Sequence, residues 1–515
     1  MTASVAAGLS GDSGWILTAA TLVVAGLLLV PGWIVGRSAR LAALPSLAVA
    51  PALSSAIIGA AEILAHTLAL PWLPWGWAVI AGLTAVLALM ARLIVGAPPE
   101  RARRAASQGR DEWVILAAGL TVAVAVPAGV ILSVLPGPGY PAQVFDATFH
   151  LNAVAAIREG GNASMLGGLS ALYSGRAVYY PTVWHGVVAL APGSPAPVST
   201  AGVLALTAVV WPLSLLGLLA RATGLDAARA SETDRARRRQ RTCAVAAVLA
   251  LSAAVVGFPL LPMTALAVWP YALSVAGLPG VLVLYDLLRQ ETASWRLRLV
   301  LVLLALAAGG GVVAAHGTGL FNLAVLSPPF LVNLLVSRWR RSATRRGGRA
   351  LLVAGAVTSV LVLAMGAWVM RASLASVLGY QRPAGGVGGI VATLGQALID
   401  LPMYGAVPGA SVPVGIVFGG LTLAAAWSAR AQRDQRPWLV MWLLSLLLVV
   451  LVGGPQWAGR QLGAPWYLQK ARILPLVILP ALVLMVQAGA GRPGRRLWRL
   501  LRRLASRVGG ARPQR

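Results

Sequence analysis

The feature that most constrains the fold is a series of apolar runs, each about as long as a membrane is thick, separated by short arginine clusters. A helix of about 20 apolar residues crosses the hydrocarbon core of a bilayer. Hydrophobic residues make up 58% of the 515 residues and charged residues 11%. The sequence therefore predicts an all-α, polytopic integral membrane protein with about 13 transmembrane helices and no sizeable soluble domain. The runs fall near 14–36, 42–70, 75–96, 113–135, 198–220, 243–262, 270–288, 297–315, 318–337, 350–370, 411–429, 438–453 and 472–490.

The basic residues predict the orientation of these helices. Alternate threading of the runs places 35 of the 42 Lys and Arg residues on one side. Cytoplasmic loops carry the excess of Lys and Arg, so we expect a multi-pass plasma-membrane protein with an extracytoplasmic N-terminus and a cytoplasmic C-terminus. The basic residues of these cytoplasmic loops then account for the formal net charge of +28. The clusters lack the interleaved aromatic residues that stack on bases, so membrane lipids are expected partners and nucleic acid is not. The basic loops are 37–40, 92–110, 221–241, 289–298, 338–349, 430–436 and the tail from 492.

Three loops on the other side are longer than a tight turn requires, at 136–197, 371–410 and 454–471. The first contains DATFHLNAVAAIREGG, a pattern that predicts a short helix at the membrane interface, ended by Gly160 and Gly161. The tail at 491–515 predicts a basic amphipathic helix that rests on anionic lipid on the cytoplasmic side.

The first of these loops holds the candidate catalytic residues, Asp146 and His150. Four residues apart on a helix, their side chains share a face. The pair could accept a proton from a substrate hydroxyl, or share a divalent metal ion, the one cofactor that the sequence suggests. The alternative is an Asp that caps the helix and a His at an aqueous surface.

Three further histidines map to the same side of the membrane. His185 lies in YYPTVWH, where Tyr180 and Trp184 could form a sugar-stacking wall or an interfacial aromatic belt. His316, in AAHGTG, ends an outward-going run and is a second candidate for substrate binding. His66 lies one turn after Glu62 and is its expected partner, either at a site or as a pair that locks two helices.

The third loop leads into GAPWYLQKARI, where Lys470 and Arg472 lie beside Trp466 and Tyr467. Cations at this interface suit a lipid phosphate, and all four residues are candidates for substrate binding. Snorkelling at a helix end is the alternative for the two cations. Asp400 is a second carboxylate that could approach the site from the middle loop.

Together, DATFHLNAV, YYPTVWH, AAHGTG and APWYLQKARI resemble an uncharacterised actinobacterial family of multi-pass membrane proteins that is similar in layout to GT-C glycosyltransferases. The resemblance implies a GT-C-like membrane core at 112–490, preceded by extra transmembrane helices at 1–111. It also implies transfer of a sugar from a polyprenyl-phosphate lipid to a glycan or glycolipid acceptor of the cell envelope, on the extracytoplasmic face. Asp146 would activate the acceptor hydroxyl, and Lys470 and Arg472 would hold the donor phosphate.

The expected function is therefore that of a membrane glycosyltransferase. Two alternatives from other classes stay open. One is a transporter or lipid-carrier flippase for envelope precursors, for which polar residues through the membrane midplane would be typical. The other is a non-catalytic membrane scaffold, which histidines lying far apart would favour.

Overall fold

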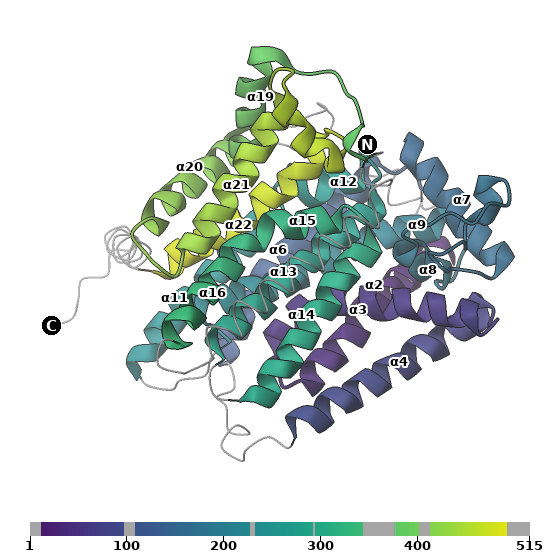
Figure 1. The fold of residues 1–515 in the computed structure, drawn as a ribbon, viewed down its shortest axis with the longest axis horizontal. Coiled ribbons are helices and arrows are strands. Elements are labelled where there is room, and N and C mark those ends of the chain that lie inside the picture. The colour runs from purple at the N-terminus through teal and green to yellow at the C-terminus, as the bar shows by residue number, and fades with distance from the viewer. Residues whose placement is uncertain are drawn as a thin grey trace.

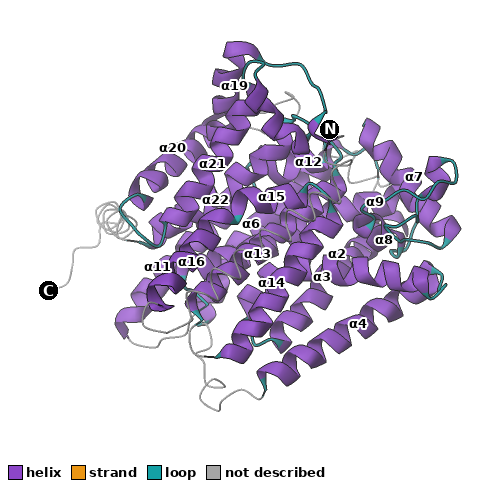
Figure 2. Ribbon diagram, in the orientation of Figure 1, coloured by secondary structure: helices purple, strands orange, loops and turns teal. Residues whose placement is uncertain are grey.

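The computed structural model describes residues 12–96, 109–137, 139–226, 232–291, 294–342, 375, 377–400 and 412–491. Figure 2 shows helices joined by loops throughout this part of the chain. Ten described helices are long and apolar enough to cross a membrane, or up to 12 if each of two bent helix pairs is one span. The prediction of an all-α, polytopic membrane protein is confirmed.

The described spans correspond one to one with the predicted apolar runs, and the run at 350–370 and the tail from 492 lie outside the described residues. The single-helix spans are α2 (Asp12–Ser38), α3 (Ala43–Thr67), α4 (Trp72–Val95), α6 (Arg110–Val134), α13 (Trp269–Gln290), α14 (Trp295–Ala315), α20 (Val412–Ala429), α21 (Arg436–Gly453) and α22 (Lys470–Ala490). Another span joins α9 (Pro195–Leu204), η2 (Ala205–Val210) and α10 (Trp211–Thr223), and α19 (Gly386–Ile399) is a shorter apolar helix.

Two spans are bent. The first joins α11 (Glu232–Ser252) to η3 (Val256–Leu260) and α12 (Leu261–Met263), with an angle of 53° at the break. The second joins α15 (Gly319–Leu326) to α16 (Pro328–Ser342), with an angle of 47°. Pro328 follows the second break directly, and the residue before a proline is disfavoured in helical conformation.

Helix α3 lies at the centre of the bundle because glycines on four other helices let their backbones approach it closely. A Cβ atom added at any of these glycines would lie within 2.6 Å of an α3 backbone atom. Such small-residue contacts are how helices associate in lipid, where there is no hydrophobic drive between them. The amino-terminal helices therefore share one core with the rest of the described chain. The glycines are Gly32 of α2, Gly217 of α10, Gly280 of α13 and Gly311 of α14.

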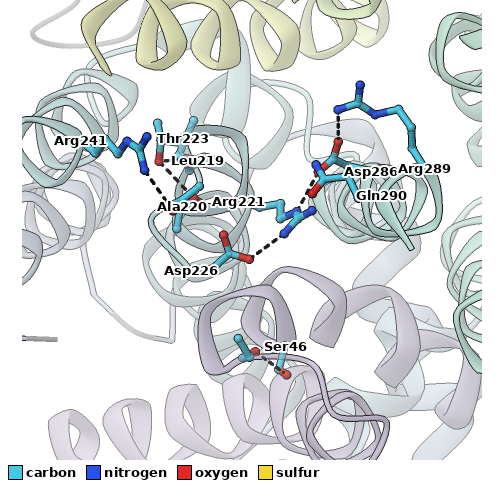
Figure 3. A network of polar contacts seen from close by, with 12 residues as sticks. Ser46, Leu219, Ala220, Arg221, Thr223, Asp226, Arg241, Asp286, Arg289 and Gln290 are labelled. Atoms are coloured by element: carbon cyan, nitrogen blue, oxygen red, sulfur yellow. Dashed lines mark hydrogen bonds and ion pairs between the residues drawn. The ribbon is translucent and has the colours of Figure 1, made fainter. Parts of the chain in front are cut away.

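The described arginine-rich turns meet at one end of the bundle, which we call the arginine end (residues 37–40, 92–96, 110–112, 221–226, 232–241, 286–291, 294–298, 430–436 and 487–491). Arg221 lies between Asp286 and Asp226 and joins the ends of α10 and α13 (Figure 3). Its N–O distances to the two carboxylates are 2.8 and 3.1 Å. The threading predicted from the sequence is confirmed for these turns. Other contacts here pair Arg238 with Glu112, Arg289 with Asp434, and the Gln240 amide with the Gly489 carbonyl.

The opposite end carries the polar loops, and we call it the histidine end (residues 62–72, 145–193, 264–271, 316–322 and 454–472). Helix α14 runs from Trp295 at the arginine end to Ala315 beside His316, about 30 Å at 1.5 Å per residue. The histidine end contains α7 (Phe145–Gly160), η1 (Ser170–Tyr173), α8 (Val183–Ala189) and η4 (Ala458–Trp466). Figure 1 shows α7, α8 and α9 gathered at one edge of the bundle.

Helix α7 is the short helix that the sequence predicts. Asp146 lies in its first turn and Arg158 in its last turn, where each charge complements the helix dipole. Gly161 ends the helix in the left-handed conformation, with φ of 64°, which glycine adopts without a steric penalty. The Arg158 guanidinium donates to the carbonyls of Ala189 and Ala191 at 3.0 and 2.6 Å. It therefore ties the end of α7 to the turn after α8.

Candidate functional site

His150 and His185 form a direct imidazole pair at the centre of the histidine end. Nδ1 of His150 lies 2.9 Å from Nε2 of His185, which is hydrogen-bonding distance. His150 comes from α7 and His185 from α8, and their residues are 5% and 0% exposed. One ring must donate and the other accept, so the pair shares one N–H between its facing nitrogens.

Aromatic rings surround this pair. Trp184 and Trp269 lie with ring centroids 4.8 Å apart, and the His150 ring lies 6.0 and 5.2 Å from them. On the other side, Tyr180 lies 5.7 Å from the His185 ring and 4.9 Å from that of Phe149. The pair is thereby screened from water.

The screening keeps both imidazoles neutral. Burial lowers the pKa of His150 to about 3, and the Arg472 charge acts in the same direction, whereas a hydrogen bond to the Ala267 backbone opposes it. Burial likewise lowers the pKa of His185 well below its usual value, and His150 adds to this. At neutral pH both rings are therefore uncharged, and their low pKa values make them poor proton acceptors.

Asp146 lies one turn before His150 on α7, with 41% of its side chain exposed. One carboxylate oxygen lies 3.9 Å from the Arg472 guanidinium, which is an ion pair but too long for a hydrogen bond. Asp146 is thus the accessible carboxylate of the site, and the buried His150 ring lies behind it.

Arg472 is a buried cation whose charge is only partly matched. Its residue is 9% exposed, and its Nε donates to the Gln469 amide oxygen at 2.8 Å. The guanidinium lies 4.6 Å from the Tyr467 ring centroid and 5.7 Å from that of Tyr271. Among the described residues, Asp146 is the one carboxylate within 4.0 Å of it. A desolvated guanidinium in this state suits an anionic ligand such as phosphate.

His316 joins the same cluster from the end of α14. Its ring meets that of Tyr271 edge to face at 5.5 Å, and its Nδ1 accepts from the Thr318 N–H at 3.2 Å. Burial lowers the pKa of His316 to about 3, and the charges of Arg472 and His150 contribute. The structure therefore brings together Asp146, His150, His185, His316 and Arg472, with Tyr180 and Trp184 around them.

Other residues singled out in the sequence lie at the margin of the cluster. Lys470 is two residues from Arg472 and so projects from another face of α22, where its Cδ approaches Gly453 of α21. Trp466 is buried, and its indole N–H donates to Asn322 at 2.8 Å. Tyr467 is 40% exposed and meets Tyr380 edge to face.

The expected pairing of Glu62 with His66 is wrong. Glu62 is 1% exposed and accepts a hydrogen bond from the Thr182 hydroxyl at 2.9 Å, whereas His66 is exposed. Their spacing of four allows a contact, but α8 packs against α3 and supplies a nearer donor to the carboxyl.

Asp400 does not reach the histidines either. It is the left-handed residue that ends α19, with φ of 49°. Its carboxylate accepts from the N–H groups of Val256 and Gly257, at the break in the first bent span. Asp400 therefore accepts hydrogen bonds from two backbone N–H groups that the break in the helix leaves without an intrahelical partner.

The suggested metal ion finds no support in side-chain geometry. Among the described residues, no group of three or more His, Cys, Asp or Glu side chains gathers closely enough to hold a metal. Asp146 and His150 alone supply two ligands, and the facing nitrogen of His150 is already engaged with His185.

Trp269 and Tyr271 are site residues that the sequence argument missed. Both lie at the start of α13 in the motif WPY, directly after the loop at 264–268 that follows α12. The sequence signal that could have identified them is their position at the start of an apolar run, at the polar end of the bundle. Aromatic residues of an interfacial belt occur at the same positions, so this signal does not distinguish site residues from a belt.

Residues 25–515 match a family of unknown function, DUF6541, and the chain belongs to that family. No curated protein and no solved structure matches the chain.

Proposed function

We propose that this DUF6541 protein is a membrane glycosyltransferase that moves a sugar from a polyprenyl-phosphate lipid to an acceptor hydroxyl of the cell envelope. The site lies on the arginine-poor side of the membrane, which the positive-inside rule makes extracytoplasmic. In this orientation the C-terminus is cytoplasmic, and lipid donor and acceptor both meet the histidine end.

The observation that carries the proposal is the Arg472 cation beside Asp146. Among the described residues the buried guanidinium makes one hydrogen bond, from Nε to Gln469, and its terminal nitrogens are free to donate to a phosphate group. Asp146 is partly exposed, so its carboxylate is the proton acceptor that a hydroxyl from the aqueous side reaches first. A cation beside an accessible carboxylate supports the proposal, because displacement of a sugar phosphate requires an anion site next to a proton acceptor.

The reaction follows from these roles. The acceptor oxygen forms a bond to the anomeric carbon as the bond from that carbon to the phosphate oxygen breaks, and the configuration inverts. Asp146 takes the hydroxyl proton, and the lipid phosphate leaves as an anion held by Arg472. The aromatic rings of Tyr180 and Tyr467 offer faces for the sugar, and the neutral histidine pair adds no second positive charge beside Asp146.

The test is transfer of radiolabelled sugar from a defined polyprenyl-phosphate donor to envelope extract by the purified protein in nanodiscs. General-base help contributes about 10²–10⁴-fold, so we expect Asp146→Asn to lower kcat by at least about 10²-fold. His66→Gln, at the exposed histidine outside the cluster, is the matched control and should keep the wild-type rate.

Full transfer activity in the folded Asp146→Asn protein would exclude Asp146 as the base. An inactive wild-type protein, tested with a panel of donors that differ in sugar, would count against the whole proposal.

A carrier of lipid-linked precursors is the second candidate, and the bent spans favour it. Broken helices with freed backbone groups form the substrate sites of many transporters, and here two spans bend by 53° and 47°. A carrier would move a fluorescent polyprenyl-phosphate lipid between leaflets of a proteoliposome without consuming it. Movement without sugar transfer would decide for this candidate.

A further inference from the structure

Glu62 is a fully buried acid that the proposed reaction does not use. It lies near the end of α3, one turn before His66, and is 1% exposed. Its Oε2 accepts from the Thr182 hydroxyl at 2.9 Å, and its Oε1 has no hydrogen-bond partner among the described residues. A carboxyl in such surroundings costs free energy, so its presence requires a specific role.

The unpartnered oxygen is packed against the backbone of α8. A Cβ atom added at Gly186 would lie 2.0 Å from Glu62 Oε1, so a side chain at 186 and the carboxyl cannot coexist. From the other side, the Trp72 indole N–H donates to the Gly186 carbonyl at 2.9 Å. Helices α3 and α4 therefore clamp the same point of α8.

His185 lies between the two points that Glu62 touches. Thr182 precedes it by three residues and Gly186 follows it directly. Helix α8 has seven residues and no side-chain cap, and a helix this short is not stable by itself. The direction of the His185 ring thus depends on the groups against which α8 rests.

We propose that Glu62 is a positioning residue that holds α8 so that Nε2 of His185 faces Nδ1 of His150. It acts through the Thr182 hydroxyl and through the backbone at Gly186. This positioning role depends on the proposed function in one respect only, which is that the imidazole pair takes part in sugar transfer. The carboxyl has one donor and no cation partner among the described residues, so a Gln side chain reproduces both its shape and its acceptor atom.

The first experiment measures kcat and the donor KM of Glu62→Ala and Glu62→Gln in the nanodisc transfer assay. Small displacements at an active site cost about 10²-fold in rate, so we expect Glu62→Ala to lower kcat by about that factor and to leave the donor KM unchanged. Glu62→Gln should retain most of the wild-type kcat. An undiminished kcat in Glu62→Ala, or an equal loss in Glu62→Gln, would overturn the positioning role.

The second experiment tests the contact by size exchange. Gly186→Ala places a methyl group where the carboxyl lies, so it should lower both the thermal midpoint and kcat. Adding Glu62→Ala removes the obstruction, and the double variant should unfold at a higher temperature than Gly186→Ala alone. A double variant that is less stable than Gly186→Ala would show that the two groups do not meet.

The third experiment needs no enzymatic activity and so separates this inference from the proposed function. Thermal midpoints are measured for Glu62→Ala, His150→Ala and their combination. Because both changes act on the placement of His185, their effects should be less than additive. His66→Ala combined with His150→Ala is the matched control and should be additive. Additive effects of Glu62→Ala and His150→Ala would contradict the inference even if sugar transfer were established.

Discussion

At the scale of single residues, the site is distinguished by buried groups that stay uncharged beside one buried cation. His150 and His185 satisfy each other at 2.9 Å inside a shell of aromatic rings. Arg472 keeps its charge through contact with Asp146 and two tyrosine faces. A neutral pair and a single cation thus lie together in one cluster, and our proposal assigns the anion to the cation and the proton to Asp146.

The buried histidines predict a pH dependence of stability. In the unfolded chain each imidazole takes up a proton near pH 6.5, whereas in the folded protein the pKa of His150 is about 3 and that of His185 is also lowered. Below pH 6.5 the unfolded state therefore binds more protons, and the free energy of unfolding falls as the pH falls. Each histidine contributes a slope of up to about 1.4 kcal/mol per pH unit.

The measurement is the thermal midpoint in detergent at pH 7.5, 6.0 and 5.0. The decline between pH 6.0 and 5.0 should be shallower in His150→Gln than in the wild type, and unaltered in His66→Gln. An identical pH profile in His150→Gln and the wild type would show that folding does not lower the pKa of His150.

At the scale of elements, close helix contacts through glycine determine the packing around α3. Gly311 of α14 faces α3, and an added Cβ would lie 1.9 Å from the Ala52 carbonyl oxygen. Its neighbour Gly310 has no atom within 4 Å of the same position. Two adjacent glycines on one helix therefore differ completely in their surroundings.

This difference predicts opposite outcomes for one substitution at neighbouring positions. Gly311→Ala forces α14 away from α3 and should destabilise the protein by about 1–3 kcal/mol or more. Gly310→Ala should be neutral or slightly stabilising because alanine favours helix by about 1 kcal/mol. Thermal unfolding of the two variants, side by side, is the measurement. Equal loss in both would mean that α14 does not pack on α3 through Gly311.

Helix α7 shows how a short element is held outside the membrane spans. The Arg158 guanidinium donates hydrogen bonds to the carbonyls of Ala189 and Ala191, at the end of α8. The His150 ring lies within hydrogen-bonding distance of His185 on α8 itself. The two elements are thereby fixed to each other at both ends of α7. Glu62 and Trp72 then fix α8 to α3 and α4.

At the scale of the whole molecule, the two ends of the bundle carry different chemistry. The arginine end is stabilised by ion pairs such as Arg221 with Asp286, and the histidine end by aromatic packing and by backbone contacts. Single-sided arginine enrichment orients membrane proteins during insertion, which places the histidine end outside the cytoplasm in our proposal.

Cysteine labelling tests this orientation. In a Cys243→Ser background, Phe145→Cys lies at the histidine end, where Phe145 is 90% exposed, and Arg433→Cys lies at an exposed position of the arginine end. A membrane-impermeant maleimide applied to intact cells should label the first variant and spare the second. Labelling of Arg433→Cys alone would invert the topology and remove the proposed lipid-linked chemistry from the outer face.

The sequence by itself determined the fold class, the described spans, the gathering of the arginine-rich turns at one end of the bundle, and the extent of α7. These features depend on local hydropathy and charge, which can be read from short stretches of sequence without knowledge of tertiary contacts. It also singled out Asp146, His150, His185, His316 and Arg472, because polar groups are costly near a bilayer and stand out.

Only the tertiary structure decided how these residues combine. The contact of His150 with His185 spans 35 residues, and that of Glu62 with Thr182 spans 120. No local pattern encodes such partners, because they depend on which helix faces meet once the glycines around α3 have brought the backbones together. The same packing buried Glu62 away from His66, turned Lys470 from the site and placed Trp269 and Tyr271 beside it.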